Sequence, residues 1–363
     1  MKPSFLILIS FLIFIGCNEA ARQPAGEEAA IDSVQQAIES LVFTEEEQGP
    51  SVKLDTPLIL SYQMTPGDEF GYSITNIEDV TIVQDTIENL NRQEVTWWYH
   101  FEVLGSGDQG TRLRVHCDRV VFQGEYNGPD GKQSIHYDSD AENSYDVEKR
   151  FAQWGAPVGA PFTIIVEEDG RIGVVSNLQE VVKNYLKDDY RTTRSDQLES
   201  IARDYADSGL KNVLQLAFQK MSTAPVRQDS TWTLVRPERI GYLAVRNEAT
   251  YRLRDVVESA LGPLAQINVT ISSSFVGDET MDTGQGLATM KEFDVHGKGS
   301  TVFNINVGRL QRRRLVTNVY VNMWVEPPDE LKELTKGTDQ AVDDFWWSSR
   351  GRTENIIEPY QRQ

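Results

Sequence analysis

The chain has 363 residues, with 55 acidic side chains against 35 basic ones and a formal net charge of −20. A protein this acidic has no basic stripe to displace counterions from phosphates, which excludes a nucleic-acid-binding role. The same charge balance excludes a polybasic attachment to anionic lipid. The length is enough for two ordinary domains or one large domain with a substantial core.

Residues 1–16 have the pattern of a secretory signal peptide. Lys2 precedes an apolar run from Phe5 to Ile15, which only Ser10 interrupts. As a helix this run spans roughly 16 Å at about 1.5 Å per residue, whereas about 20 residues are needed to cross a bilayer. The run therefore predicts a cleaved signal and not a transmembrane anchor.

The run ends at Phe14-Ile15-Gly16-Cys17, which resembles the lipobox of bacterial lipoproteins. Phe14 stands where leucine is commoner, so an ordinary cleaved signal is the alternative. The resemblance implies cleavage after Gly16 and acylation of Cys17, with a palmitate-like chain beside a diacylglyceryl group. More than one chain gives lasting attachment, so Cys17 would anchor the protein to a membrane. Asn18 is not the aspartate that retains some lipoproteins at the inner membrane, so we expect a place in the bacterial cell envelope, with the outer membrane favoured.

Two short segments follow the predicted cleavage site. Residues 17–30 are small, polar and acidic, which is typical of a flexible, lipidated tether. Residues 31–50 predict an amphipathic helix and a linker. The apolar stripe of the helix consists of Ile31, Val34, Ile38, Leu41 and Val42.

Residues 51–175 are expected to form a first β unit. From Val95 to Val103 apolar side chains alternate with mixed ones, which predicts an antiparallel strand with one face on a core. Asp169-Gly170 separates two further strand candidates and predicts a tight hairpin, because this pair accepts positive φ values.

Cys17 and Cys117 are the two cysteines of the chain. If Cys17 is acylated, Cys117 has no partner for an intrachain disulfide. Cys117 shares the apolar face of its strand with Leu113 and Val115. This placement favours a buried, inert thiol over a reactive one.

The remaining residues continue the pattern. Residues 176–224 predict a helical connector, with a capping box at Ser176 and Gln179 and a bend at Gly209. Residues 225–327 predict a second β unit in an order that echoes the first, with coincidence among strands as the alternative to duplication. Residues 328–363 read as a charged, irregular tail, whose Phe345-Trp346-Trp347 folds back onto the body or docks a partner.

The expected fold class is therefore α+β and rich in β-structure. Two antiparallel β-sheet units, related by a degenerate duplication and half-barrel-like, would have helices between them and packed on them.

A search for catalytic motifs finds no phosphate loop, nucleophile elbow or paired Cys-x-x-Cys. The four histidines, His100, His116, His136 and His296, are scattered, so we expect exposed or structurally bonded rings and no metal site. The acidic segment from His136 to Glu142 could offer oxygen ligands to calcium, but it lacks the central glycine of an EF-hand loop. A solvated loop is the favoured interpretation. We expect no cofactor.

Trp98 and Trp324 fall on the nominally polar faces of amphipathic strands. Helices covering both sheet faces would explain them, and so would an apolar ligand cavity that the two rings line.

Four short motifs, together with the lipobox, resemble a family of uncharacterised bacterial lipoproteins of the Bacteroidetes type that carries a domain of unknown function. The resemblance covers about residues 54–326 and implies no activity. The motifs are Gly67-Asp68-Glu69-Phe70, Tyr137-Asp138-Ser139, Asp169-Gly170-Arg171-Ile172 and Gln228-Asp229-Ser230-Thr231-Trp232. Gln228 replaces the family's glycine and Ile172 its valine.

We therefore expect a membrane-anchored, non-enzymatic protein with a binding or structural role, whose partner is an envelope protein or a lipid. One alternative is a carrier of lipid or another apolar ligand, similar in plan to the curved half-barrels that shuttle lipoproteins. A second alternative is a hydrolase, which requires that carboxylates and a histidine such as His136 and Asp138 converge in one cleft.

Overall fold

The computed structural model describes residues 47, 49–129, 131–240, 243–283, 286–336 and 343–362. The predicted signal peptide, the Gly16-Cys17 processing site, the tether and the helix from Ile31 to Val42 lie outside the described residues. Within the described ranges, no helix is long and apolar enough to cross a membrane.

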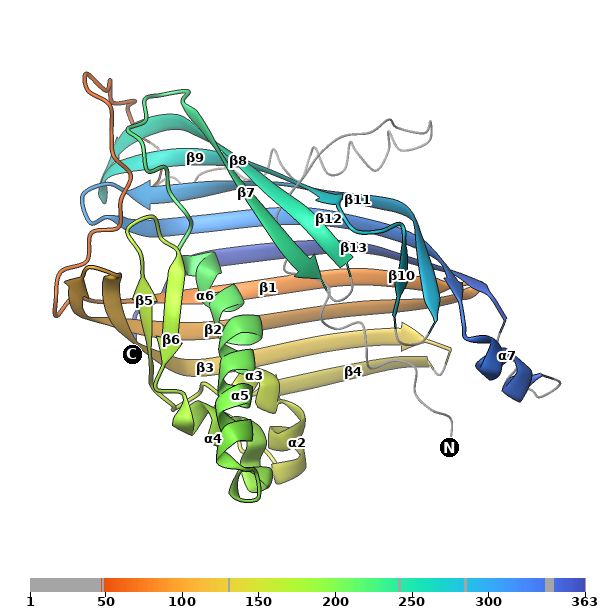
Figure 1. Ribbon diagram of the computed structural model, residues 1–363. Coiled ribbons are helices and arrows are strands. Elements are labelled where there is room, and N and C mark those ends of the chain that lie inside the picture. The colour runs from red at the N-terminus through yellow and green to blue at the C-terminus, as the bar shows by residue number, and fades with distance from the viewer. Residues whose placement is uncertain are drawn as a thin grey trace.

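Thirteen strands form one antiparallel sheet in the order β6-β5-β3-β2-β1-β13-β12-β11-β9-β8-β7, with β4 on β3 and β10 on β11 (Figure 1). The strands are β1 (Glu69–Gln84), β2 (Ile87–Gly107), β3 (Gly110–Gly128), β4 (Gly131–Asp138), β5 (Phe162–Val166), β6 (Ile172–Ser176), β7 (Thr231–Ile240), β8 (Leu243–Ser259), β9 (Gly262–Phe275), β10 (Thr280–Asp282), β11 (Leu287–Asn304), β12 (Arg309–Glu326) and β13 (Phe345–Pro359). The β-rich fold is confirmed. The predicted division into two sheet units and their duplication are not confirmed, because strands from both halves share one sheet.

Strand β13 is the element that joins the two halves. It lies between β1 and β12 and pairs antiparallel with both, so the segment expected to be an irregular tail contains a central strand. Trp347 of this strand is buried and Phe345 partly buried, as the prediction that the aromatic cluster folds back onto the body requires, whereas Trp346 on the other face is 47 % exposed.

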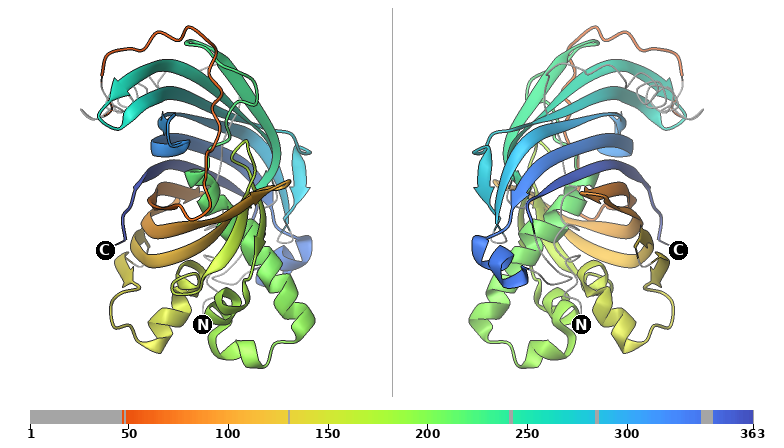
Figure 2. Two further views of the ribbon diagram at one scale, coloured as in Figure 1. Left: turned by 90° about the vertical axis from the view of Figure 1, so that its left-hand side faces the viewer. Right: turned by 90° about the vertical axis from the view of Figure 1, so that its right-hand side faces the viewer.

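The alternation in β2 shows how the sequence divides the two faces of the sheet. Val95, Trp97, Tyr99, Phe101 and Val103 are all buried, as their spacing predicts. Their register partners on β3 are buried as well, and those on β1 are buried or, at Phe70, partly buried, because paired residues lie on the same face. This face is the concave side of a strongly curved sheet (Figure 2).

Helices pack on that concave side (Figure 2): those of the predicted connector, residues 176–224, and two short ones between residues 145 and 155, inside the segment predicted as the first β unit. The helices are α2 (Tyr145–Arg150), α3 (Ala152–Gly155), α4 (Gln179–Leu186), the 3₁₀ turn η2 (Lys187–Arg191), α5 (Ser195–Tyr205), the π-helical turn η3 (Ala206–Leu210), α6 (Lys211–Ala217) and, near the other end of the sheet, α7 (Asp329–Thr335). The bend expected at Gly209 is this π-helical turn, through which α5 runs into α6.

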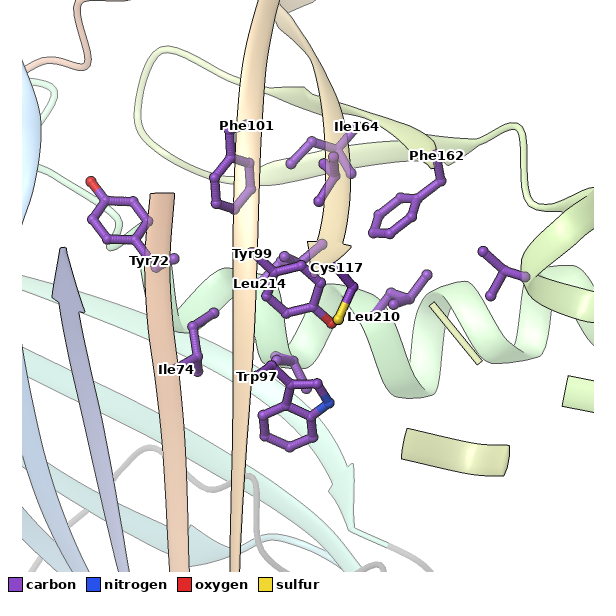
Figure 3. Close-up of a cluster of buried hydrophobic side chains, with 14 of the residues drawn as sticks. Tyr72, Ile74, Trp97, Tyr99, Phe101, Cys117, Phe162, Ile164, Leu210 and Leu214 are labelled. Carbon is purple, nitrogen blue, oxygen red and sulfur yellow. The ribbon is translucent and has the colours of Figure 1, made fainter. Parts of the chain in front are cut away.

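Helix α6 brings a row of apolar side chains onto the sheet. Leu214 lies with Tyr99 and Phe101 of β2 in one buried cluster, which also contains Phe162 and Ile164 of β5 (Figure 3). Beyond the helix, the ring of Phe218 contacts Tyr62, Phe70, Tyr72 and Phe101, with ring centroids 5.3–6.5 Å apart. Apolar and aromatic packing on this scale dominates the stability of a core.

Polar contacts fix the carboxyl-terminal end of α6. Nη1 of Arg313, on β12, donates a hydrogen bond to the carbonyl oxygen of Leu216 at 3.1 Å. Two residues beyond the helix, Gln219 accepts a hydrogen bond from the hydroxyl of Thr301 at 2.5 Å. A cation at the carboxyl end of a helix pairs with its unsatisfied carbonyls and its dipole, so the buried Arg313 positions α6 on the sheet.

The predicted Asp169-Gly170 hairpin is confirmed between β5 and β6. Gly170 has a φ of 88°. A Cβ at this position would lie 2.5 Å from the carbonyl oxygen of Gln219. Glycine is therefore required here both for the backbone conformation and for the close approach of the segment after α6.

Candidate functional site

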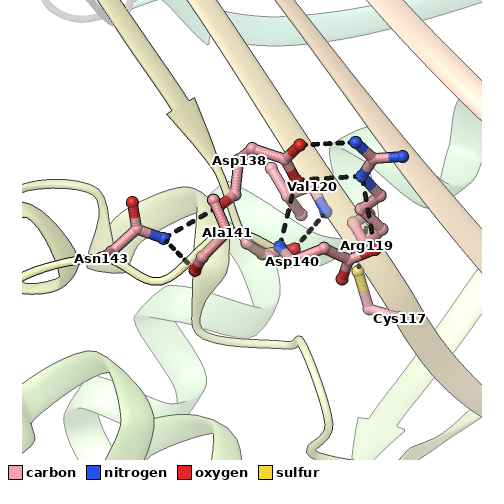
Figure 4. A network of polar contacts seen from close by, with 8 residues as sticks. Cys117, Arg119, Val120, Asp138, Asp140, Ala141 and Asn143 are labelled. Atoms are coloured by element: carbon pink, nitrogen blue, oxygen red, sulfur yellow. Dashed lines mark hydrogen bonds and ion pairs between the residues drawn. The ribbon is translucent and has the colours of Figure 1, made fainter.

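The acidic segment after β4 is held by a single arginine (Figure 4). Nε and Nη2 of Arg119 donate to the two carboxylate oxygens of Asp138 at 2.9 and 2.5 Å, and Asp140 lies 3.5 Å from Nε. The Asn143 side chain donates to the carbonyl oxygens of Asp138 and Ala141. The hydrogen bond from Arg119 lowers the pKa of Asp138. Because the guanidinium of Arg119 already pairs with both carboxylates, the segment after β4 is held against β3 by this contact, and its carboxylates do not form a calcium site.

The histidines do not gather with these carboxylates. His136 is exposed on β4. His100 and His116 are register partners on β2 and β3, on the convex face, and Nε2 of His100 lies 3.4 Å from a carboxylate oxygen of Glu69. Partial burial and the nearby Arg362 lower the pKa of His116. Among the described residues, no three His, Cys, Asp or Glu side chains are placed to hold a metal ion.

Cys117 is buried beside Tyr99 at the base of the helical cover (Figure 3). Burial raises the pKa of its thiol well above the ordinary value. The thiolate is the reactive form of cysteine, so this position matches the expected inert, structural thiol.

Trp98 and Trp324 both lie on the convex face, opposite to the helices. The guanidinium of Arg119 covers the ring of Trp98 at 5.3 Å from its centroid. The ring of Trp324 meets that of Trp346 edge to face at 5.1 Å. These contacts, and not the expected helix cover or ligand cavity, account for the two aromatic residues on this side of the sheet.

An acidic cleft of about 780 Å³ lies at the ends of β3, β5 and β6. Its walls include Asp108, Glu167, Glu168 and Asp169. Glu167 forms an ion pair with Arg171, and Asp169 forms one with Lys220. These ion pairs hold the β5–β6 hairpin and the segment after α6 in place. The acidic side chains of the cleft therefore have a structural role in its walls.

The concave face beyond α6 has a different character. One end carries an apolar cluster drawn from seven strands, which we call the Phe/Met cluster. Its buried members are Ile82, Leu243, Val245, Met290, Val295, Val319, Val321 and Trp347, and its partly exposed members are Val80, Phe275, Met281, Phe293, Met323, Val325 and Phe345. Methionine and phenylalanine at a partly exposed apolar surface suit an adaptable binding surface.

Between this cluster and α6, the concave face turns polar on three central strands. We call these five residues the polar band, and each is between 1 and 9 % exposed: Asn76 and Glu78 on β1, Thr353 and Asn355 on β13, and Thr317 on β12. The register places Asn76 opposite Asn355, Glu78 opposite Thr353, and Thr353 opposite Thr317. Residues paired in this way have neighbouring side chains on one face.

The carboxyl group of Glu78 is held from two sides. The side-chain amides of Asn76, at 2.7 Å, and Gln93 each donate a hydrogen bond to one of its oxygens. Burial raises the pKa of Glu78, although both hydrogen bonds act in the opposite direction. The band is thus an acceptor-rich surface around a buried acid.

Four oxygen atoms of the band have no hydrogen-bond partner among the described residues. They are Oδ1 of Asn76, Oγ1 of Thr317, Oγ1 of Thr353 and Oδ1 of Asn355. A buried polar atom without a partner costs about 1–3 kcal/mol, and such atoms are rare in folded proteins. Four of them together on one face make this band the candidate binding site of the protein.

The sequence carried a faint signal of this site. Ser349, Gly351, Thr353 and Asn355 alternate on β13 where a central strand ordinarily carries apolar residues. That polar composition is why the segment reads as a tail.

Comparisons with known proteins give a family but no activity. A sequence family described as "Family of unknown function (DUF6263)" matches residues 121–308, just over half of the chain. No curated protein matches the sequence significantly.

Three solved structures show weak similarity. The first, "Lipid-protein interactions in lipovitellin", is 11 % identical with a TM-score of 0.38 and covers 83 % of this chain; this chain spans 26 % of the lipovitellin chain. The COG4313 outer membrane channel from Pseudomonas putida F1 is 6 % identical with a TM-score of 0.21; the match covers 82 % of this chain and 97 % of the channel. OccK7 (OpdD) from Pseudomonas aeruginosa is 4 % identical with a TM-score of 0.19; the match covers 81 % of this chain and 100 % of OccK7.

TM-scores of this size do not establish a shared fold, so the family match is the informative comparison. Because it covers more than half of the sequence, the chain belongs to the family of unknown function DUF6263.

Proposed function

We propose that this protein is a lipoprotein of the bacterial cell envelope, anchored through acyl chains on Cys17, and that it acts as a binding protein rather than an enzyme. The lipobox-like segment that ends at Gly16-Cys17 supports the anchor. The net charge of −20 supports attachment by lipid chains, because an acidic body has no electrostatic hold on anionic lipid. The residue after the cysteine, Asn18, is not the aspartate that retains some lipoproteins at the inner membrane, so the outer membrane is favoured.

One observation carries the binding role: beyond α6 the concave face combines the apolar Phe/Met cluster with a buried polar band. A surface that separates apolar from polar groups in this way fits an amphipathic ligand. The space between α6 and the sheet is filled by Leu214, Phe218 and their neighbours, so the binding surface is the concave face beyond that helix.

The carrier of an apolar ligand remains the second candidate, on a different surface from the one expected. Trp98 and Trp324 lie outside the curve of the sheet and do not support it. The partly exposed phenylalanine and methionine side chains of the Phe/Met cluster do.

The non-enzymatic role rests on where the candidate catalytic groups lie. Asp138 is engaged by Arg119, and His136 is exposed on β4. A hydrolase needs such groups within hydrogen-bond reach of each other and of one substrate.

Cys17→Ser tests the anchor. We expect the wild-type protein to fractionate with membranes and to carry acyl chains on Cys17 in mass spectra, and the variant to be released into the soluble fraction. Cys117→Ala is the matched control, because it removes the other cysteine and should leave the protein on the membrane. Membrane association of a signal-cleaved Cys17→Ser protein would contradict the lipid anchor.

Mass spectrometry of the protein purified from its native membrane tests the binding role. We expect an amphipathic molecule to co-purify in a fixed ratio to the chain. A protein that repeatedly purifies without such a molecule, in gentle detergent, would refute the binding role while leaving the anchor intact.

A further inference from the structure

The four unpartnered atoms of the polar band share one chemical property. Each is an oxygen atom: two are amide oxygens, which only accept hydrogen bonds, and two are hydroxyl oxygens, which accept and donate. Asn76 has turned its amide nitrogen to Glu78, so its free oxygen is the group that remains for a ligand. The band therefore needs a partner that brings hydrogen-bond donors.

The charges on this face further restrict the chemical class of the ligand. A carboxylate or phosphate in the band would meet the amide oxygens of Asn76 and Asn355, whose partial negative charge repels a negative group. Arg313, on the same face, donates through Nη1 to the carbonyl of Leu216 at the end of α6, and Arg309, over the ring of Phe70, pairs with Asp68. A cationic group would require the buried Glu78 to be ionised, which burial opposes. Neutral hydroxyl groups are not repelled by the amide oxygens and do not require Glu78 to be ionised. They can also accept hydrogen bonds from the threonine hydroxyls.

The strands themselves lead from the band to the Phe/Met cluster. On β1, Val80 and Ile82 follow Glu78 on the same face, and on β12, Val319 and Val321 follow Thr317. Alternate residues of a strand are about 6.6 Å apart, so an apolar surface begins within one side-chain spacing of the band. A ligand with its head in the band would lay an apolar chain along these valine and isoleucine side chains.

We infer that the polar band binds the neutral, hydroxyl-bearing head group of an amphipathic molecule, such as an acylglycerol, whose chain lies on the Phe/Met cluster. This inference rests on the proposed binding role and gives its ligand a chemical class. Thr317 and Thr353 are register partners on β12 and β13, so their two unpartnered hydroxyls can meet the same head group.

The test compares three probes of equal chain length by isothermal titration calorimetry: 1-octanoylglycerol, octanoate and octylamine. The full chain with Cys17→Ser is used, so that attached acyl chains do not compete. We expect 1-octanoylglycerol to bind about tenfold or more tightly than either charged probe, which corresponds to about 1.4 kcal/mol.

The double variant Thr317→Val/Thr353→Val removes the two hydroxyls with little change in side-chain volume. We expect it to lower the affinity for 1-octanoylglycerol about tenfold and to leave that for octanoate unchanged. Thr233→Val/Thr250→Val is the matched control, because it removes an exposed cross-strand threonine pair, on β7 and β8, whose hydroxyls lie 3.1 Å apart. Thermal unfolding of both variants verifies that they fold.

The outcomes separate the two levels of the proposal. If all three probes bind equally and the double variant has no effect, the band holds ordered water only, and the head-group assignment is wrong while the binding role survives. Tighter binding of octanoate or octylamine likewise overturns the assignment. If no probe binds and no molecule co-purifies with the native protein, the binding role itself fails.

Discussion

Replacing Leu214 with alanine tests whether helix α6 is part of the core or only rests on it. Leu214 is 0 % exposed and lies between α6 and the concave face of the sheet, beside Tyr99 and Phe101. The substitution keeps a residue with high helix propensity, so the helix itself should form equally well. The measured change therefore reports the packing of α6 against the sheet.

The expected cost is about 3–4 kcal/mol. Removing a buried leucine side chain to Cβ loses its transfer free energy and leaves a cavity, and measured values for such changes run from about 2 to 5 kcal/mol. Here the neighbours are aromatic rings fixed on hydrogen-bonded strands, and Phe218 closes the cluster on the other side. These groups cannot easily move inward to fill the space, so the cost should exceed the lower limit of that range.

Urea denaturation followed by far-ultraviolet circular dichroism gives the free energy of unfolding for the Cys17→Ser protein with and without the substitution. Leu334→Ala is the matched control, because Leu334 also lies in a helix but is 79 % exposed. We expect this control to change the stability by less than about 0.5 kcal/mol. A cost for Leu214→Ala below about 1 kcal/mol, with an unchanged denaturant dependence, would refute the packing of α6 described above.

Four further predictions concern single residues. Cys117 should resist thiol reagents at pH 8 in the folded Cys17→Ser protein and react once urea unfolds it, because burial raises its pKa; rapid labelling of the native state would contradict this. Asp138→Asn should cost about 1 kcal/mol at pH 7; since Arg119 lowers the pKa of Asp138, the difference from wild type should shrink as the pH falls from 5 towards 2, and a constant difference would argue against the pair. Glu78→Gln should behave in the opposite way: burial raises the pKa of Glu78, so the stability that its protonated form contributes at low pH is lost as the pH rises above about 4.5, and the variant should become more stable relative to wild type as the pH rises; a pH-independent difference in the free energy of unfolding would argue against a buried acid. Gly170→Ala should lower the thermal midpoint by several degrees, corresponding to about 1–3 kcal/mol, and an unchanged midpoint would rule out the backbone strain assigned there.

The local elements of this fold were predictable where an apolar pattern defines them. The alternation from Val95 to Val103 and the Asp169-Gly170 turn both lead to the observed strands and hairpin. The predicted start of helix α4 differs from the observed one. Ser176 and Gln179 resemble a capping box, but Ser176 ends β6 and the helix begins at Gln179. Short-range patterns fix the type of an element better than its ends.

The order of the strands could not be predicted, because it depends on contacts between distant segments. Strand β13 was missed for a more specific reason. Its concave positions carry serine, glycine, threonine and asparagine in place of apolar residues, so the period-two signal is absent. These polar residues include Thr353 and Asn355 of the polar band. The side chains that make the band a candidate binding site are therefore also the reason why the sequence pattern did not predict the strand.

The structure does not support the candidate site inferred from the tryptophans, because both rings lie on the convex face and each has a contact of another kind. Trp98 pairs with an arginine and Trp324 with another tryptophan, and neither contact can be read from strand periodicity. The acyl site at Cys17 stays a prediction.

The central place of β13 also sets the order in which the chain can fold. Its partners are β1, near the beginning of the sheet-forming region, and β12, so a contact such as Ile74 with Ile357 closes a loop of nearly the whole folded chain. Contacts this far apart in sequence form slowly. Until residues 345–359 have been synthesised, β1 and β12 each present an open edge, and an open edge pairs readily with another chain. A nascent or truncated chain therefore exposes these two strand edges, and pairing of β13 with β1 and β12 is the step that covers both.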